Sequence, residues 1–213
     1  MVTPTDIGPI AQRSMQSPCN RLGVKQWSNM VGRLVPSTGR VQLATVPTPH
    51  ASPYGIAVNS QGTLFLAEFG SNKLASIDPD TLQIREYILP DADSRPRRIA
   101  IASNGVIWYS DYACGALGRY DPKAGEACEC PSPRGPGSGP YGIATVDDIM
   151  WYSESGFQPN TLVRFDPKSE TFETWVIPSG GGVVRNMMPA RDGKLVLACS
   201  GVNRIALVEV KQR

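Results

Sequence analysis

The chain has 213 residues, of which 41% are hydrophobic and 19% charged, a balance typical of globular domains. Its formal net charge of +2 is too small to indicate nucleic acid binding. No apolar run is long enough for a membrane span, and the first 20 residues lack the apolar core of a leader peptide. The sequence therefore predicts no nucleic acid or membrane partner, and it leaves the cellular compartment unknown.

A pattern of short strands returns about every 43 residues. Four similar segments begin 43 or 44 residues apart: Pro53–Val58, Pro96–Ile101, Pro140–Thr145 and Val184–Pro189. The Asp-Pro pairs that begin at Asp78, Asp121 and Asp166 recur at nearly the same spacing. A period of 40 to 45 residues with four strands per unit is typical of a β-propeller blade. We therefore predict an all-β propeller of four-stranded blades, with about five repeats present.

The predicted strands follow this period along the chain. Residues 1–28 match it poorly and residues 1–20 are expected to be poorly ordered, whereas 29–213 form the repeats. The expected strands lie at 54–58, 63–68, 73–77 and 84–89; at 98–102, 106–110, 116–120 and near 127; at 141–145, 149–153, 162–165 and 172–177; and at 185–188, 195–199 and 204–210. The last repeat has no fourth strand, and no helix longer than two turns is expected. Packing between blades should bury Ile56, Leu64, Ile99, Trp108, Ile143 and Trp151.

Three segments carry a family resemblance: Ala67–Leu74, Ile107–Asp111 and Gly142–Pro178. With them, residues 29–210 resemble the virginiamycin B lyase (streptogramin lyase) family. That resemblance implies a seven-bladed propeller, so the present chain is shortened relative to the family. It also implies an elimination reaction that opens a cyclic depsipeptide antibiotic at an ester, helped by Mg²⁺.

This chain differs from the family at the positions of the catalytic histidines. The resemblance places them second in each blade-opening motif, where this chain has Tyr54, Arg97, Tyr141 and Arg185. The single histidine of the sequence, His50, lies in a Pro-rich connection. A general base needs a pKa near the working pH, which tyrosine and arginine ordinarily lack. The family resemblance implies an enzyme, but the residues at the histidine positions do not favour one. We therefore assign no catalytic residue.

Hairpin register predicts which side chains gather at the mouth of the propeller channel. The expected neighbours are Tyr54 with Glu68, Arg97 with Asp111, Tyr141 with Glu154, and Arg185 with Cys199. The candidate ligand-binding residues are therefore Tyr54, Arg97, Tyr141 and Arg185. The candidate metal ligands, for Mg²⁺ or Ca²⁺, are Glu68, Asp111 and Glu154. Arginine suits an anionic ligand, but Arg97 can also simply neutralise Asp111, and Tyr54 can fix its hairpin through Glu68.

Three functions remain open from the sequence. The first is a lyase-like propeller acting on a small ester or cyclic ligand at the channel mouth. The second is a metal-dependent hydrolase resembling gluconolactonases, and the third is a non-catalytic propeller that binds a ligand or a protein. We expect a monomer whose partner is a small-molecule ligand, anionic if the arginines bind it. The five cysteines are scattered except for Cys128 and Cys130, which are better explained as spare thiols than as half of a zinc site.

Overall fold

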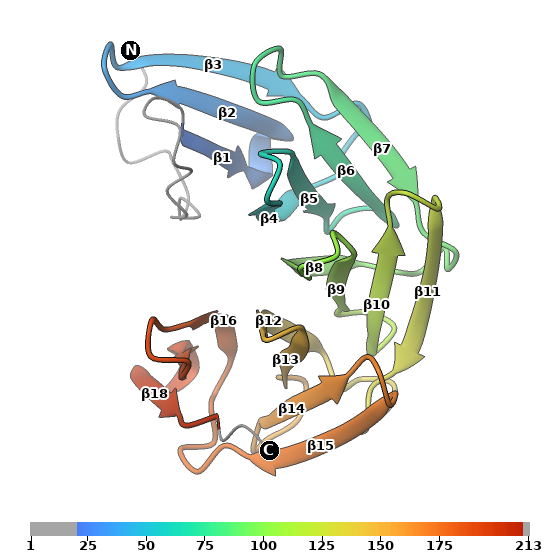
Figure 1. Ribbon diagram of the computed structural model, residues 1–213, viewed down its shortest axis with the longest axis vertical. Coiled ribbons are helices and arrows are strands. Elements are labelled where there is room, and N and C mark those ends of the chain that lie inside the picture. The colour runs from blue at the N-terminus through green and yellow to red at the C-terminus, as the bar shows by residue number, and fades with distance from the viewer. Residues whose placement is uncertain (1–20, 211–213) are drawn as a thin grey trace. The chain divides into compact units, whose positions relative to one another are not determined.

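The computed structural model describes residues 21–210, so the prediction made for residues 1–20 lies outside the described residues. Strands dominate this part of the chain, and its helical elements are two single 3₁₀ turns, Gln26–Ser28 and Ser200–Val202 (Figure 1). Within residues 21–210, no helix has the length and apolarity needed to cross a membrane. The predicted all-β class is confirmed.

The strands form five antiparallel sheets in two compact units, 1–97 and 98–213. The first unit holds a three-stranded sheet, β1-β2-β3, and a four-stranded sheet, β4-β5-β6-β7. The bounds of these strands are β1 (Arg21–Lys25), β2 (Met30–Val35), β3 (Arg40–Thr45), β4 (Pro53–Val58), β5 (Leu64–Glu68), β6 (Lys73–Ile77) and β7 (Ile84–Ile88). Strand β1 shows that the first sheet includes residues from the segment that matches the repeat poorly.

The boundary between the units falls within β8, and the second unit holds the rest of the sheet β8-β9-β10-β11, the four-stranded sheet β12-β13-β14-β15 and the three-stranded sheet β16-β17-β18. Their bounds are β8 (Pro96–Ile101), β9 (Ile107–Asp111), β10 (Ala116–Asp121), β11 (Glu126–Pro131), β12 (Pro140–Val146), β13 (Ile149–Glu154), β14 (Thr161–Asp166), β15 (Thr171–Val176), β16 (Val184–Pro189), β17 (Leu195–Cys199) and β18 (Arg204–Val208). Among residues 21–210 the last sheet has three strands, β16, β17 and β18, which agree with the three strands predicted for that repeat. Each sheet is a meander in which consecutive strands pair, which is the construction of a propeller blade (Figure 1).

The recurring Asp-Pro pairs are turns that close the third strand of each blade. The Asp78 carboxylate accepts hydrogen bonds from the backbone N–H groups of Asp80 and Thr81, at 2.9 and 2.8 Å. Asp121 accepts from Lys123 in the same way, and Asp166 from Lys168. An aspartate that binds the backbone two residues later mimics a turn, and the following proline presets φ for it. Each Asp-Pro pair in the sequence therefore indicates a turn at that point of the chain.

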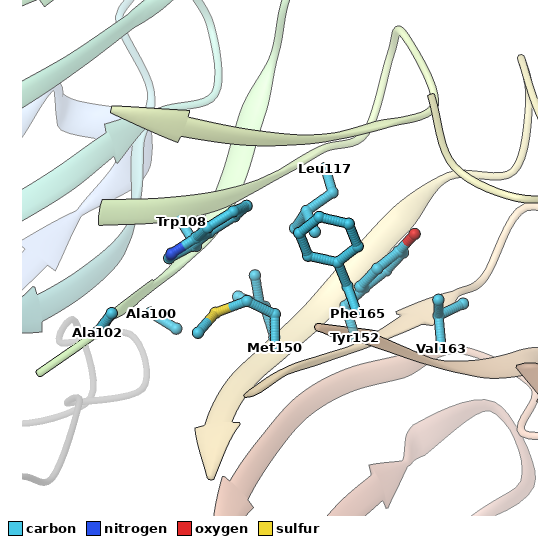
Figure 2. Packing of buried hydrophobic residues seen from close by; sticks show 9 residues of the cluster. Ala100, Ala102, Trp108, Leu117, Met150, Tyr152, Val163 and Phe165 are labelled. Atoms are coloured by element: carbon cyan, nitrogen blue, oxygen red, sulfur yellow. The ribbon is translucent and has the colours of Figure 1, made fainter. Parts of the chain in front are cut away.

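The blades are held together by apolar side chains from neighbouring sheets. In the second unit, Trp108 packs against Phe165 with ring centroids 5.5 Å apart, and Met150 and Tyr152 lie in the same cluster (Figure 2). Five of the six side chains expected to be buried are buried. Ile56 is the exception, because it is only partly buried at the margin of the first unit's core.

Candidate functional site

A β-bulge near the start of the first strand changes the predicted register of the blade hairpins. In the first unit Ile56 lies opposite Leu66, as expected, but Pro53 rather than Tyr54 lies opposite Glu68. The predicted pairing of Tyr54 with Glu68 is therefore wrong by one residue. The physical reason is that a bulge sets two residues of one strand against one residue of its partner.

The bulge recurs in the second unit. Pro140, not Tyr141, lies opposite Glu154, and Val184, not Arg185, lies opposite Cys199. The predicted pairings of Tyr141 and Arg185 are thus also displaced by one residue. Bulges re-aim the side chains that follow them, so the ends of these strands present their side chains differently from a regular hairpin.

Buried serines satisfy the backbone at the starts of β8 and β12. The backbone N–H of Gly142 donates to Ser153 Oγ at 3.2 Å, and that of Arg98 donates to Ser110 Oγ at 3.1 Å. Ser110 Oγ in turn donates to the carbonyl oxygen of Tyr141 at 2.7 Å, linking its blade to the next. A buried polar atom without such a partner is costly. The two serines therefore stabilise the starts of β8 and β12, of which β12 carries a bulge.

Glu68 is a buried acid at the end of β5. Its Oε2 accepts a hydrogen bond from Ser71 Oγ at 2.8 Å, while its Oε1 has no hydrogen-bond partner. Burial raises the pKa of Glu68 to about 7, and the nearby Glu86 carboxylate also raises it. Burial acts in the same direction on Glu86, but hydrogen bonds from Lys73 and Thr48 lower the pKa of Glu86 overall. The two acids therefore ionise at different pH.

Asp111 and Glu154 are buried, and their carboxylates accept hydrogen bonds from nearby residues. Asp111 Oδ1 accepts from the backbone N–H groups of Ala113 and Cys114, at 3.0 and 3.1 Å. Glu154 Oε1 accepts from Ser132 Oγ at 2.8 Å and from the backbone N–H of Arg134 at 2.9 Å. Thr161 Oγ1 donates to the other oxygen of Glu154. Both carboxylates thus order the loops at the ends of their hairpins.

These residues do not fit the divalent-metal site expected from the family. Between residues 21 and 210, no three side chains of His, Cys, Asp or Glu gather closely enough to hold a metal ion. Mg²⁺ and Ca²⁺ need several convergent oxygen ligands, whereas both oxygens of Glu154 and Oδ1 of Asp111 accept hydrogen bonds from neighbouring N–H and O–H groups.

Arg97 lies against two aromatic rings in the first unit. Its guanidinium carbon is 5.3 Å from the centroid of the Tyr54 ring and 4.5 Å from that of Phe69. The two rings are themselves neighbours, with centroids 6.1 Å apart. A guanidinium at this distance from an aromatic face is held by cation–π attraction. We call this group of three residues the first aromatic–arginine cluster.

In the second unit there are two separate ring contacts, Tyr112 with Tyr141 and Arg134 with Phe157, and we call these two pairs together the second aromatic–arginine cluster. The exposed Tyr112 meets the buried Tyr141 edge to face, with centroids 6.0 Å apart. The guanidinium carbon of Arg134 is 4.6 Å from the Phe157 centroid, and its Nη1 donates to the carbonyl oxygen of Pro159 at 2.9 Å. The Tyr141 ring thus packs against the exposed Tyr112 ring, and little of Tyr141 itself is accessible to solvent.

Arg185 stands apart from both clusters. It is exposed at the start of β16, and its Nε donates to Ser200 Oγ at 3.1 Å. Of the four predicted ligand-binding residues, Tyr54 and Arg97 meet in the first cluster and Tyr141 supports the second. Their binding role stays a prediction.

The sequence reasoning missed the aromatic residues in the turns that follow β1, β5, β9 and β13. They are Trp27, Phe69, Tyr112 and Phe157. Trp27 is 92% exposed, Phe157 38% and Tyr112 36%, and Phe69 is partly exposed. Their spacings of 42, 43 and 45 residues follow the blade period, so the signal was present in the sequence. The corresponding turn of the last blade, Ser200–Val202, has no aromatic residue.

Comparison with known proteins identifies related sequences and structures. The model of the "Virginiamycin B lyase family" matches residues 23–128. No curated protein matches the chain. Among solved structures, a catalytically inactive histidine-to-alanine variant of virginiamycin B lyase from Staphylococcus aureus, with quinupristin, is 28% identical with a TM-score of 0.80. That match covers 90% of this chain and 63% of the other, so the chain spans less than two thirds of the length of that relative.

Two further structures extend the comparison. A structure described as a streptogramin B lyase is 20% identical, with a TM-score of 0.76, and the match covers 92% of this chain and 67% of the other. A gluconolactonase from Xanthomonas campestris is 16% identical, with a TM-score of 0.68 and coverage of 91% and 72%. At these identities the two matches establish the propeller fold alone.

Proposed function

Because the chain is a propeller of the virginiamycin B lyase family, we propose that it binds a small molecule at the hairpin ends of its blades. The observation that carries this proposal is the aromatic residue repeated in the turns that follow β1, β5, β9 and β13. Exposed aromatic rings beside arginines suit a ligand that combines apolar or aromatic groups with carbonyl or anionic oxygens. The first and second aromatic–arginine clusters each present such a surface in their own unit.

The ligand class follows from the family relationship. The related S. aureus structure is described with quinupristin, and we propose a cyclic or ester-bearing ligand of that class for this chain. We propose binding without catalysis, because the residues at the family's histidine positions are tyrosine and arginine. At neutral pH an ordinary tyrosine or arginine is protonated and cannot act as a general base. The gluconolactonase-like alternative has less support, since the described carboxylates do not converge on a metal site.

Binding should be measured by calorimetric titration of the purified chain with quinupristin. We expect Arg97→Ala or Arg134→Ala to weaken binding by about 1.5–3 kcal/mol, the size of a hydrogen bond to a charged group. Arg191→Ala, which changes an exposed arginine in the turn between β16 and β17, should leave the affinity unchanged. Equal losses in all three variants would point to a general charge effect, and unchanged affinity in Arg97→Ala and Arg134→Ala would refute the assigned clusters.

Ring opening should be assayed separately, with the same compound and Mg²⁺. Elimination across the ester breaks the ring without changing its mass, so cyclic and linear forms are separated by chromatography. We expect no conversion above the rate without protein, because no residue at the family's histidine positions can accept the proton. Robust conversion by the purified chain would show that a base has been overlooked.

A further inference from the structure

An asparagine stands immediately before one strand in four of the blades. Asn29 precedes β2, Asn72 precedes β6, Asn160 precedes β14 and Asn203 precedes β18. The backbone carbonyl oxygens of the first three accept the N–H of the residue that follows β3, β7 and β15, at 2.9, 2.9 and 3.0 Å. The asparagine therefore lies where the connection to the next blade begins.

The side chain of Asn29 shows this position with its amide fully paired. Asn29 Nδ2 donates to the carbonyl oxygens of Val46 and Thr48, at 3.1 and 2.8 Å. Asn29 Oδ1 accepts from the backbone N–H of Ser52 at 3.2 Å. These three partners lie in the connection between β3 and β4. One amide thus binds the start of the connection through its donor and the end through its acceptor.

Asn160 is fully buried, but only the donor of its amide is paired. Its Nδ2 donates to the carbonyl oxygen of Phe157 at 2.9 Å, whereas its Oδ1 has no hydrogen-bond partner within residues 21–210. The bond to Phe157 fixes which end of the amide is the donor, because a carbonyl oxygen cannot pair with Oδ1. A buried acceptor without a donor is costly. Asn160 Oδ1 therefore lacks the kind of partner that Asn29 finds in Ser52.

Three successive glycines lie beside this acceptor, in the connection between β15 and β16. Gly180, Gly181 and Gly182 all have positive φ, of 79°, 72° and 63°. A β-carbon on Gly181 would lie 2.7 Å from Asn160 Oδ1, so this oxygen faces the backbone of Gly181. The N–H of Gly180 donates to the carbonyl oxygen of Ile177 at 2.8 Å, whereas in the described part of the chain the N–H of Gly181 donates to no backbone carbonyl. An acceptor without a donor therefore lies beside a backbone N–H that no carbonyl satisfies.

Asn160 belongs to the turn that carries part of the second aromatic–arginine cluster. This turn joins β13 to β14 and includes Phe157, whose ring is 38% exposed and lies 4.6 Å from the guanidinium carbon of Arg134. Gln158 Nε2, in the same turn, donates to the carbonyl oxygen of Gly182 at 2.6 Å. The turn therefore links the exposed ring and its cation to the glycine segment beside Asn160.

We propose that Asn160 Oδ1 and the N–H of Gly181 form a subsite for an amide group of the ligand. The ligand N–H donates to Asn160 Oδ1, and the ligand carbonyl oxygen accepts from Gly181. Cyclic depsipeptides carry such amides, so the subsite rests on the proposed function and adds a specificity contact to it. Because Asn160 is buried, the ligand reaches it when the glycine segment moves, and glycine permits this movement since no side chain restricts its backbone.

The first test is a titration of the isotope-labelled chain with quinupristin, followed by two-dimensional NMR. We expect the amide proton of Gly181 to shift downfield, as a newly formed hydrogen bond requires, over the same concentration range as the side-chain signal of Arg134. A shift of the Arg134 signal without one at Gly181 would overturn the subsite and leave the second aromatic–arginine cluster as the binding surface. If neither signal moves, both the subsite and the proposed binding at this cluster are wrong.

Two neighbouring glycines provide a matched pair of variants. Gly181→Ala and Gly180→Ala both place a side chain at positive φ, so both carry the same kind of backbone strain. The added β-carbon lies 2.7 Å from Asn160 Oδ1 in the first variant, and 3.9 Å from Gln158 Oε1 in the second. We expect Gly181→Ala to weaken quinupristin binding about tenfold, and Gly180→Ala to change it less than about twofold. Equal affinities in the two folded variants would exclude the subsite. If Gly181→Ala does not fold, the NMR titration of the unchanged chain decides.

Discussion

Replacing Gly118 with alanine should destabilise the chain by about 3 kcal/mol, at the upper end of the usual cost of overpacking. Gly118 lies on β10 opposite Tyr109, and a β-carbon at this position would overlap the Tyr109 ring. That ring is fully buried and cannot easily move aside, because its hydroxyl donates to Glu129 Oε1 at 2.7 Å. The change in free energy of unfolding is measured by urea denaturation followed by tryptophan fluorescence.

A control and a rescue separate this clash from a general effect of alanine in strands. Gly23→Ala places a β-carbon in open space on β1 and should change stability little. In a Tyr109→Leu background the ring is absent, so Gly118→Ala should cost much less, and the difference gives the coupling between the two positions. A full loss of stability from Gly118→Ala in the Tyr109→Leu background would mean that the ring is not the cause.

Replacing Glu68 with glutamine should make the chain more stable at pH 8 and leave its stability nearly unchanged at pH 5. The pKa of Glu68 is raised from 4.5 to about 7 in the folded chain. The folded state therefore holds more protons than the unfolded state between these values, so stability falls as pH rises through this range. Glutamine cannot ionise and avoids this cost, which we expect to be about 2 kcal/mol after allowance for solvent screening.

Urea denaturation of both proteins at pH 5, 6, 7 and 8 measures the effect. Glu126→Gln, which changes an exposed glutamate on β11, is the matched control and should not alter the pH dependence. If Glu68→Gln parallels the original chain at every pH, Glu68 does not titrate in this range. If it is less stable at pH 8, the ionised carboxylate makes favourable contacts that outweigh its burial.

This chain differs from the family at the positions where the resemblance implies histidine. The blade positions where the family resemblance implies histidine hold Tyr54, Arg97 and Tyr141, and the structure uses them in aromatic and cation–π contacts. Such contacts favour recognition over proton transfer, because a guanidinium held against aromatic rings remains a cation. The proposed binding and the expected lack of ring opening are separate predictions, and the two assays with quinupristin test them independently.

The blade repeat could be predicted from the sequence because its signals are local. Strand alternation, the Asp-Pro turns at Asp78, Asp121 and Asp166, and the glycines in tight turns act within a few residues. For the same reason the strand bounds agree closely with those predicted. The repeated aromatic residues in the turns were also readable, although they were overlooked.

The side-chain partners at the site were decided only by the tertiary structure. The bulges in β4, β12 and β16 each displace the hairpin pairing by one residue, and a shift of one residue turns a side chain to the other face. Contacts such as Ser110 to Tyr141 and Ser132 to Glu154 join segments far apart in the sequence. Their formation depends on how one blade packs on the next, so hairpin spacing alone could place the acids at strand ends but could not identify their partners.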